Sequence, residues 1–350
     1  MRGFMRPAAG LTCLFALGAA GCSSGGTGAS DSAPAQISQA PRASAAPSES
    51  ASASDTSSST SYAPYVSATE ASATDSTGSP TTYNLAFVIS DGTHCTAKWN
   101  GTDAIDKAAV KSRISALKES GASVRVSFGG ASGKELAEVC DSASALAAAY
   151  GAALDAAGST QADFDIEGDT LPDSASVALR SKAIALLQKE RSDLTVSFTL
   201  PVMPSGLDSD GLALLESAND NSVQVSTVNI MTMNYGSSYT ADMGDYAEKS
   251  AEATHDQLQK FFGLSSAGAW RGLALTSMIG DNDVSNETFS LSDAAQVRAF
   301  AESKKIAWVS MWSTFRDQQC SSDDASSDNA ATNCSGVSQS SGAFAEAFAG

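Results

Sequence analysis

The sequence predicts an α/β protein in which one domain, residues 62–350, forms a (β/α)8 (TIM) barrel. From residue 62 onward, short runs rich in β-branched and aromatic residues alternate with longer Ala-rich amphipathic runs, which is typical of repeated βα units. Eight short runs occur over a length typical of such a barrel. A doubly wound open sheet is the main alternative, but neither GxGxxG nor GxxxxGK[ST], the phosphate loops of such sheets, occurs here.

Each element is placed by its periodicity and its flanking residues. We expect strands at 63–67, 83–90, 123–128, 162–167, 194–200, 226–235, 271–279 and 306–312. We expect helices at 103–120, 134–157, 174–191, 208–218, 245–262 and 292–304. Gly121 and Gly158 are placed to end two helices, and Ser292 to cap the last. Residues 68–82 are polar and turn-rich, so no helix is expected in the first crossover.

The first 21 residues are typical of an export signal. Arg2 and Arg6 precede a short apolar run that is too short to span a bilayer. The run ends at Cys22 after small residues, which resembles the lipobox of bacterial lipoproteins, where the Cys carries lipid; an ordinary signal peptide is the alternative. Residues 22–61 are rich in Ser and Ala and lack large apolar side chains, so we expect a disordered tether. The protein is therefore expected to be secreted, or lipid-anchored at the extracellular face of a bacterial cell membrane.

The charge balance excludes one class of partner. The chain carries 21 Lys and Arg against 39 Asp and Glu, a formal net charge of -18. A surface this acidic repels phosphate backbones, so we expect no nucleic acid partner. A monomer is expected.

Cysteine usage agrees with export. Two of the six cysteines belong to the leader and its cleavage site. The folded part keeps four, Cys95, Cys140, Cys320 and Cys334. An even number outside the cytoplasm suggests two disulfides; we favour Cys95 with Cys140 and Cys320 with Cys334, while other pairings and free thiols stay open. With no CxxC and only two histidines, His94 and His255, both expected at the surface, we expect no metal and no cofactor.

The segment Ala162–Glu167 carries the most informative pattern. Asp163, Asp165 and Glu167 alternate with Phe164 and Ile166, so in a strand the three acids share one face. Inside a barrel the apolar face packs on helices and the acids point inward. Carboxylates this close and partly buried cannot all ionise, so at least one has a raised pKa, as a general acid requires. An amphipathic strand with a solvated acidic face is the alternative.

These acids, with three further motifs, resemble glycoside hydrolase family 18, the chitinases and endo-N-acetylglucosaminidases. The family's fourth-strand signature DxxDxDxE matches at its last three acids, with Thr160 in place of the first Asp. The family's SxGG motif is matched by Ser127, Gly129 and Gly130. Its Met followed two residues later by Tyr is matched by Met233, Asn234 and Tyr235, and its Trp on the eighth strand by Trp312. Gly236 stands where an Asp often follows the Tyr. Archaeal chitinase catalytic domains are the most similar subgroup.

The resemblance implies a retaining hydrolase that cleaves β-1,4-linked N-acetylglucosamine with help from the substrate's own acetamido group. In that scheme Glu167 is the proton donor, Asp165 orients the amide N–H, and Asp163 shares a proton with Asp165. Tyr235 donates to the acetyl oxygen. Trp312 forms the floor of the sugar site, with Ser127 supporting Asp163.

Several further residues have an equally plain structural interpretation. Met233 either lines the acetyl pocket or fills the core. Trp99 either stacks on a sugar or covers the barrel rim. Asn282 and Asp283 follow the seventh strand at the active face, yet both types commonly form turns.

The motifs leave the substrate open. The first hypothesis is a hydrolase of chitin or its oligomers, and the second is an endo-β-N-acetylglucosaminidase acting on N-glycans. A non-catalytic glycan-binding surface protein is the alternative from another class of function. A wall-remodelling enzyme acting on peptidoglycan is a further possibility.

Overall fold

The computed structural model describes residues 60–321, 329–330 and 332–350, which belong to one compact unit, Ser44–Gly350. The predicted signal peptide, Cys22 and the tether up to residue 59 lie outside the described residues. The strands are β1 Ser61–Tyr62, β2 Tyr65–Ser67, β3 Thr82–Ile89, β4 Lys98–Trp99, β5 Asp103–Ala104, β6 Ser123–Gly129, β7 Gln161–Asp165, β8 Thr195–Pro201, β9 Val225–Met231, β10 Leu273–Met278, β11 Gly280–Asp281, β12 Thr288–Phe289 and β13 Trp308–Trp312.

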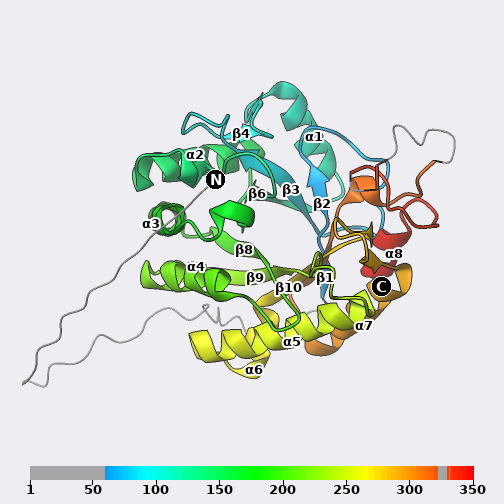
Figure 1. The fold of residues 1–350 in the computed structure, drawn as a ribbon. Helices are drawn as coiled ribbons and strands as arrows, with labels where there is room; N and C mark the ends of the chain where they lie inside the picture. The colour runs from blue at the N-terminus through cyan, green and yellow to red at the C-terminus, as the bar shows by residue number, and fades with distance from the viewer. Residues whose placement is uncertain (1–59, 322–328, 331) are drawn as a thin grey trace, which may run out of the picture. The chain divides into compact units, whose positions relative to one another are not determined.

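The described helices alternate with these strands. They are α1 Ala108–Lys118, α2 Ala143–Ala157, α3 Ser174–Glu190, α4 Ser209–Asp220, α5 Met243–Phe262, α6 Ser266–Arg271, α7 Leu291–Lys304 and α8 Ala343–Ala349, with 3-10 turns η1 Leu136–Glu138, η2 Gly168–Thr170 and η3 Thr314–Arg316. Figure 1 shows the helices arranged around the strands.

The strands close into a barrel. Parallel pairing runs from β13 through β10, β9, β8, β7 and β6 to β3. The short β1 and β2 act as two halves of one strand interrupted at Ala63 and Pro64, because β1 pairs with β13 and β2 pairs with β3. These pairings join the two ends of the sheet, so the predicted (β/α)8 barrel is confirmed.

The outer faces of β6, β7 and β8 show why the acids point inward. Phe128, Phe164 and Phe198 lie side by side in register on adjacent strands, with ring centroids 5.2 and 5.7 Å apart. Tyr150 of α2 packs edge-on against Phe164 at 5.0 Å. Because side chains alternate along a strand, this apolar ladder under the helices directs Asp163 and Asp165 into the barrel.

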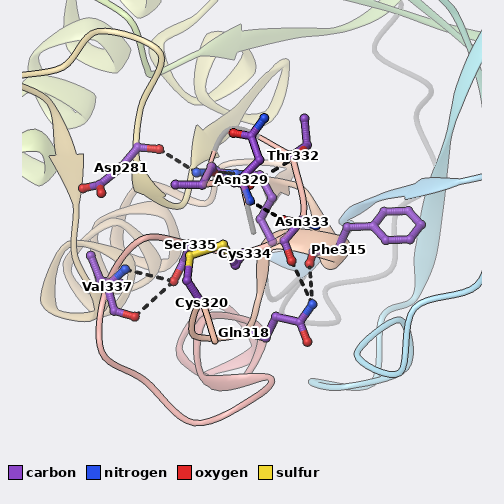
Figure 2. The surroundings of a disulfide bond; sticks show 12 residues. Asp281, Phe315, Gln318, Cys320, Asn329, Thr332, Asn333, Cys334, Ser335 and Val337 are labelled. Carbon is purple, nitrogen blue, oxygen red and sulfur yellow. Dashed lines mark hydrogen bonds between the residues drawn. A yellow bond between two sulfur atoms is a disulfide. The ribbon is translucent and has the colours of Figure 1, made fainter. Parts of the chain in front are cut away.

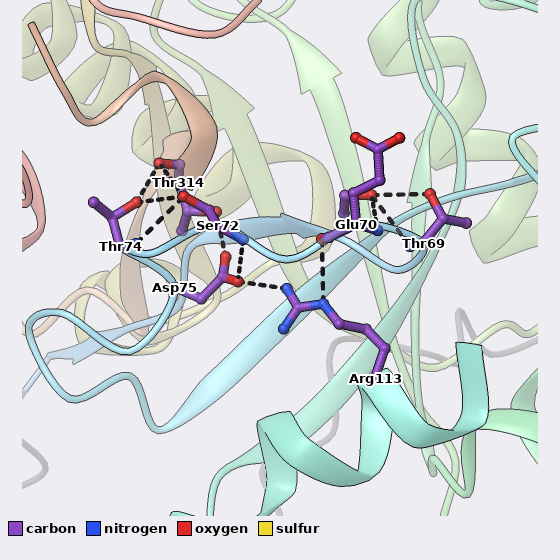
Figure 3. Close-up of polar contacts among 8 residues, drawn as sticks. Thr69, Glu70, Ser72, Thr74, Asp75, Arg113 and Thr314 are labelled. Atoms are coloured by element: carbon purple, nitrogen blue, oxygen red, sulfur yellow. Dashed lines mark hydrogen bonds and ion pairs between the residues drawn. The ribbon is translucent and has the colours of Figure 1, made fainter. Parts of the chain in front are cut away.

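The first crossover contains no helix, as the sequence predicts, and side chains hold it in place (Figure 3). Asp75 accepts hydrogen bonds from the Arg113 guanidinium of α1 at 2.6 Å and from the Thr314 hydroxyl of η3 at 2.7 Å. Arg113 also donates to the Glu70 carbonyl at 3.2 Å. The polar composition of the segment therefore connects it to α1 and to the segment that follows β13.

Both favoured disulfides are present, Cys95–Cys140 and Cys320–Cys334. Figure 2 shows the surroundings of the second, where the Gln318 side chain donates to the Asn333 carbonyl at 2.8 Å. This disulfide joins the segment after η3 to the one that contacts β11, since Asp281 N donates to the Ser335 carbonyl at 2.7 Å. In the part of the chain that the structure describes, no helix has the length and apolarity needed to span a bilayer.

Two predicted helices begin too early. The helix expected at 134–157 starts at Ala143, because Glu135 caps a separate 3-10 turn and Cys140 forms its disulfide ahead of the helix. The helix expected at 103–120 starts at Ala108, because residues 103–104 pair with β4 as β5.

Three smaller predictions are also wrong. Ser290, not Ser292, caps α7, with Asp293 completing a capping box. The strand expected to reach residue 235 ends at Met231. His255 is buried and stacks on Trp270 at 4.1 Å, whereas His94 is exposed as expected.

Candidate active site

The site forms at the end of β7, where β6 passes unusually close. Gly129 and Gly130 have φ of +99° and +93°, which side-chain-bearing residues rarely adopt. A Cβ on Gly129 would lie 2.1 Å from the Asp165 carbonyl oxygen, which Gly130 N contacts at 2.9 Å. The glycines of the SxGG motif therefore let the backbone approach Asp165; neither lines the substrate cavity described below.

Asp163 lies deepest and is surrounded by hydroxyl groups. Ser127 Oγ and the Tyr65 hydroxyl donate to Oδ2 at 2.7 and 3.0 Å. Ser197 Oγ and Thr199 Oγ1 donate to Oδ1 at 2.7 and 2.8 Å. Four donors on two oxygens suit an ionised carboxylate. The predicted contact from Ser127 is therefore present, and all four hydrogen bonds to the Asp163 carboxylate come from hydroxyl groups. The predicted sharing of a proton between Asp163 and Asp165 stays a prediction.

Asp165 is buried one step above. Its Oδ1 has no hydrogen-bond partner within the described part of the chain. Burial, followed by the charges of Glu167 and Asp163, raises the pKa of Asp165 well above its usual value. A buried oxygen without a partner is unfavourable unless a ligand supplies one, so this atom is suited to meet a donor group of a bound molecule.

Glu167 lies just past β7 in extended conformation, with φ -143° and ψ -179°. The alternation of β7 therefore continues through it, and Glu167 lines the same cavity as Asp165. Burial first, and the charge of Asp283 second, raises the pKa of Glu167 to about 7. A carboxylic acid that keeps its proton near neutral pH can serve as a general acid.

The cavity at the barrel mouth has about 500 Å³ of open space and carries aromatic, Met and polar side chains. Its lining residues are Tyr65, Phe87, Ala131, Asp165, Glu167, Thr199, Met231, Met233, Asn234, Thr276, Met278, Asp283 and Trp312. The rings of Trp312 and Phe87 are stacked, with centroids 5.5 Å apart. This pair gives the cavity an apolar wall suited to the face of a sugar ring.

The role assigned to Tyr235 from the sequence is wrong. Tyr235 is only 4% exposed and does not line the cavity. Its hydroxyl is hydrogen-bonded with Ser250 Oγ of α5 at 3.3 Å, and its ring packs against Tyr239 and Tyr246. The side chain therefore faces the helices, and its hydroxyl cannot orient a group in the cavity.

The chain path after β9 explains the error. The strand ends at Met231, Met233 N turns back to the Met231 carbonyl at 2.9 Å, and Asn234 has φ +56°. This left-handed residue breaks the alternation, so Tyr235 turns outward while Met233 and Asn234 line the cavity. Alignment of the Met–x–Tyr motif on Met231 instead places Met233 at the Tyr position.

Trp99 also departs from expectation. It is 0% exposed and lies in β4, paired with Val88 of β3. A side chain this buried cannot stack on a sugar, so its alternative role, cover at the barrel rim, fits the structure.

Asp283 and Phe87 are among the cavity residues that the motifs did not assign. The sequence places Asp283 at the active face, with a turn as the alternative interpretation. Its Oδ2 accepts a hydrogen bond from Asn234 Nδ2 at 3.0 Å, and both residues line the cavity. The signal available in the sequence was its position directly after the seventh barrel strand. Among the described residues, no cluster of three or more His, Cys, Asp and Glu is arranged to hold a metal ion.

Sequence comparison finds chitinases. A probable bifunctional chitinase/lysozyme of Escherichia coli and endochitinase 11 of Metarhizium anisopliae are each 33% identical to this chain over 275 residues, 73% of its length. The aligned region is 31% and 52% of those two proteins, so the chain spans less than two thirds of either. No protein-family profile matches the chain.

Structural comparison agrees. The catalytic domain of a hyperthermophilic chitinase from Pyrococcus furiosus superposes with a TM-score of 0.71 at 28% identity, over 82% of this chain and 93% of that domain. A GH18 chitinase from Pseudoalteromonas aurantia, at 16% identity and TM-score 0.54 over 77% and 97% of the two chains, shares the fold. The chain is therefore similar in sequence to part of two chitinases and has the fold of the family 18 chitinase catalytic domains.

Proposed function

We propose that this relative of the family 18 chitinases is a retaining glycoside hydrolase that cleaves β-1,4-linked N-acetylglucosamine. One observation carries the proposal: Glu167, with a pKa near 7, shares a cavity with the partnerless Oδ1 of Asp165 and the Trp312 ring. A proton donor, an amide acceptor and an apolar wall are what substrate-assisted cleavage requires.

In the proposed reaction Glu167 protonates the glycosidic oxygen while the acetamido oxygen attacks the anomeric carbon. The bond to the leaving sugar breaks, and an oxazolinium ion forms. While Glu167 is protonated, one of the charges that raise the pKa of Asp165 is absent, so we assign Asp165 the ionised form in this complex. Asp165 then accepts a hydrogen bond from the acetamido N–H and offsets the positive charge. Glu167, now ionised, takes a proton from the water that opens the ring, so the product keeps the anomeric configuration of the substrate.

The acetyl oxygen needs a donor other than Tyr235. The lining hydroxyls already donate elsewhere, those of Tyr65 and Thr199 to Asp163 and that of Thr276 to Asn229. Asn234 and Trp312 are the lining residues with side-chain N–H groups. We assign the acetyl oxygen to the Asn234 amide and the sugar face to Trp312. Asn234 Nδ2 donates to Asp283 at 3.0 Å, and its other contact, with Met278 Sδ at 4.0 Å, is one that a stronger acceptor such as the acetyl oxygen would replace.

Charge favours a neutral sugar chain. A second hollow that shares Glu167, Met233 and Asn234 with the cavity adds Asp208 to the acids, and none of the described residues lining either hollow is Lys or Arg. The lactyl carboxylate of muramic acid would be repelled there. We therefore place chitin and its oligomers ahead of peptidoglycan. The predicted lipid on Cys22 and the tether would hold the domain, as a monomer, at the outer face of the cell membrane.

The test is a comparison of substrates. The protein is incubated with an N-acetylglucosamine tetramer, a high-mannose glycoprotein and peptidoglycan, and the anomer of the first product is followed by NMR. We expect cleavage of the tetramer with the β-anomer formed first. Initial α-anomer would exclude the retaining mechanism. Equal cleavage of an oligomer without N-acetyl groups would exclude substrate assistance, and preference for the glycoprotein would shift the assignment to N-glycans.

A further inference from the structure

Asp283 belongs to the cavity but to none of the motifs. It follows β11, in the connection between β10 and α7, three barrel strands away from β7. It lines the cavity together with Asp165 and Glu167 although it is remote from both in sequence. Asp283 is exposed at the cavity mouth, and a third carboxylate there adds to the repulsion between like charges.

Hydrogen bonds fix the Asp283 carboxylate toward the cavity. Asn234 Nδ2 donates to Asp283 Oδ2 at 3.0 Å, and Asn234 Oδ1 accepts from Val284 N at 3.4 Å. The next residue back, Asn282, is buried and donates to the carbonyls of Met278 and Gly280 at 2.8 and 3.0 Å. The backbone on both sides of Asp283 is therefore held, and the side chain is bonded from the opposite loop.

No nearby cation of the described chain forms an ion pair with Asp283. Arg316 is buried, and its guanidinium donates hydrogen bonds to the carbonyls of Ala330, Trp312 and Asp281. Its charge and that of Asp283 influence each other. Since the Arg316 hydrogen bonds end on backbone oxygens, the negative charge of Asp283 stays available to the cavity.

We propose that Asp283 is a positioning residue for proton donation: held by Asn234 at the cavity wall, its charge keeps Glu167 protonated until substrate binds. The titratable groups that share the two hollows with Glu167 are Tyr65 from β2, Asp165 from β7, Asp283 after β11 and Asp208 at the start of α4. After burial itself, the charge of Asp283 is what raises the pKa of Glu167. This inference rests on the proposed function, because it assigns Glu167 as the acid.

The test is the pH dependence of kcat/KM on the N-acetylglucosamine tetramer for the full chain. In Asp283→Asn, loss of the negative charge lowers the pKa of Glu167, so the alkaline limb moves to lower pH. We expect a shift of about half a pH unit or more, equivalent to about threefold lower activity on the alkaline side. Asp283→Glu keeps the charge and should restore the limb.

Asp281→Asn is the matched control. It lies two residues away, does not line the cavity, and can still accept from the Thr288 hydroxyl. The alkaline limb of the kcat/KM profile of Asp281→Asn should coincide with that of the wild type. The proposal would be overturned if the alkaline limb of Asp283→Asn coincided with that of the wild type. It would also be overturned if kcat/KM fell by the same factor at every pH.

If the wild type cleaves no substrate, the proposed function fails while the effect of Asp283 is still measurable. Infrared difference titration of the protonated Glu167 carboxyl, with Glu167→Gln as the blank, should then give a lower pKa in Asp283→Asn than in the wild type. Identical titrations would contradict the inference on Asp283 alone.

Discussion

The ends of β7 and β9 differ in how far strand geometry continues, and the difference decides which side chains reach the cavity. At β7, extended backbone carries the alternation from Asp163 through Glu167. At β9, the chain leaves the strand at Met231 and turns through the left-handed Asn234, so Tyr235 faces α5. Alternation identifies a site only as far as the backbone stays extended.

The largest expected effect tests the β7 end. Glu167→Gln keeps the shape of the side chain but removes its proton, so kcat on the tetramer should fall by about 10³-fold. Affinity for the oligomer, measured by calorimetry, should stay close to that of the wild type. Retained turnover would mean that another group donates the proton.

Asp165→Asn tests the second acid of the same strand end. An amide cannot supply the charge that offsets the oxazolinium ion, so kcat should fall by about 10²-fold. Steady-state kinetics on the tetramer, with Asp281→Asn as the control, measures this. A change confined to KM would reduce Asp165 to a binding residue.

Gly129→Ala tests the close approach of β6 that supports the β7 end. The added Cβ would lie 2.1 Å from the Asp165 carbonyl oxygen at a φ of +99°. We expect a loss of at least about 2 kcal/mol in the free energy of unfolding, measured by urea denaturation.

Gly263→Ala is the control for backbone strain, since Gly263 has φ +68° with no atom within 4 Å of the added Cβ. This variant should lose only about 1 kcal/mol. Equal losses in the two variants would show that φ alone, rather than the approach of Asp165, makes Gly129 necessary.

The smallest expected effect tests the β9 end. Tyr235→Phe removes the hydrogen bond with Ser250, so the free energy of unfolding should fall by about 1 kcal/mol. Because the hydroxyl faces α5, kcat should stay within about twofold of the wild type. A fall in kcat of tenfold or more would restore the catalytic role that the motif predicts.

Much of the barrel follows from the sequence because its strands are short, apolar on the outer face and separated by recognisable helices. The inward acids were predictable from the alternation along their strand, and the two disulfides from an even number of cysteines in a chain expected to be exported. The start of α2 was not, since an amphipathic pattern from residue 134 does not reveal a 3-10 turn capped by Glu135.

The remaining errors at the site arise from long-range geometry. Trp99 is buried because β4 folds back on β3, and Asp283 reaches the cavity because Asn234 holds it from another loop. The pairing of β4 leaves no pattern in the residues around Trp99. The position of Asp283 after the seventh strand indicated the active face but not its contact with Asn234. A single left-handed residue, Asn234, was enough to move Tyr235 to the opposite face.

The central claim is that Glu167 carries a proton near neutral pH inside the cavity, and a direct titration tests it best. Carboxyl ¹³C NMR of the protein labelled at Glu, with Glu167→Gln to identify the signal, follows one group across the pH range. We expect a titration midpoint of about 7 for Glu167 in the free protein. A midpoint near the ordinary value of Glu, about 4.3, would contradict it.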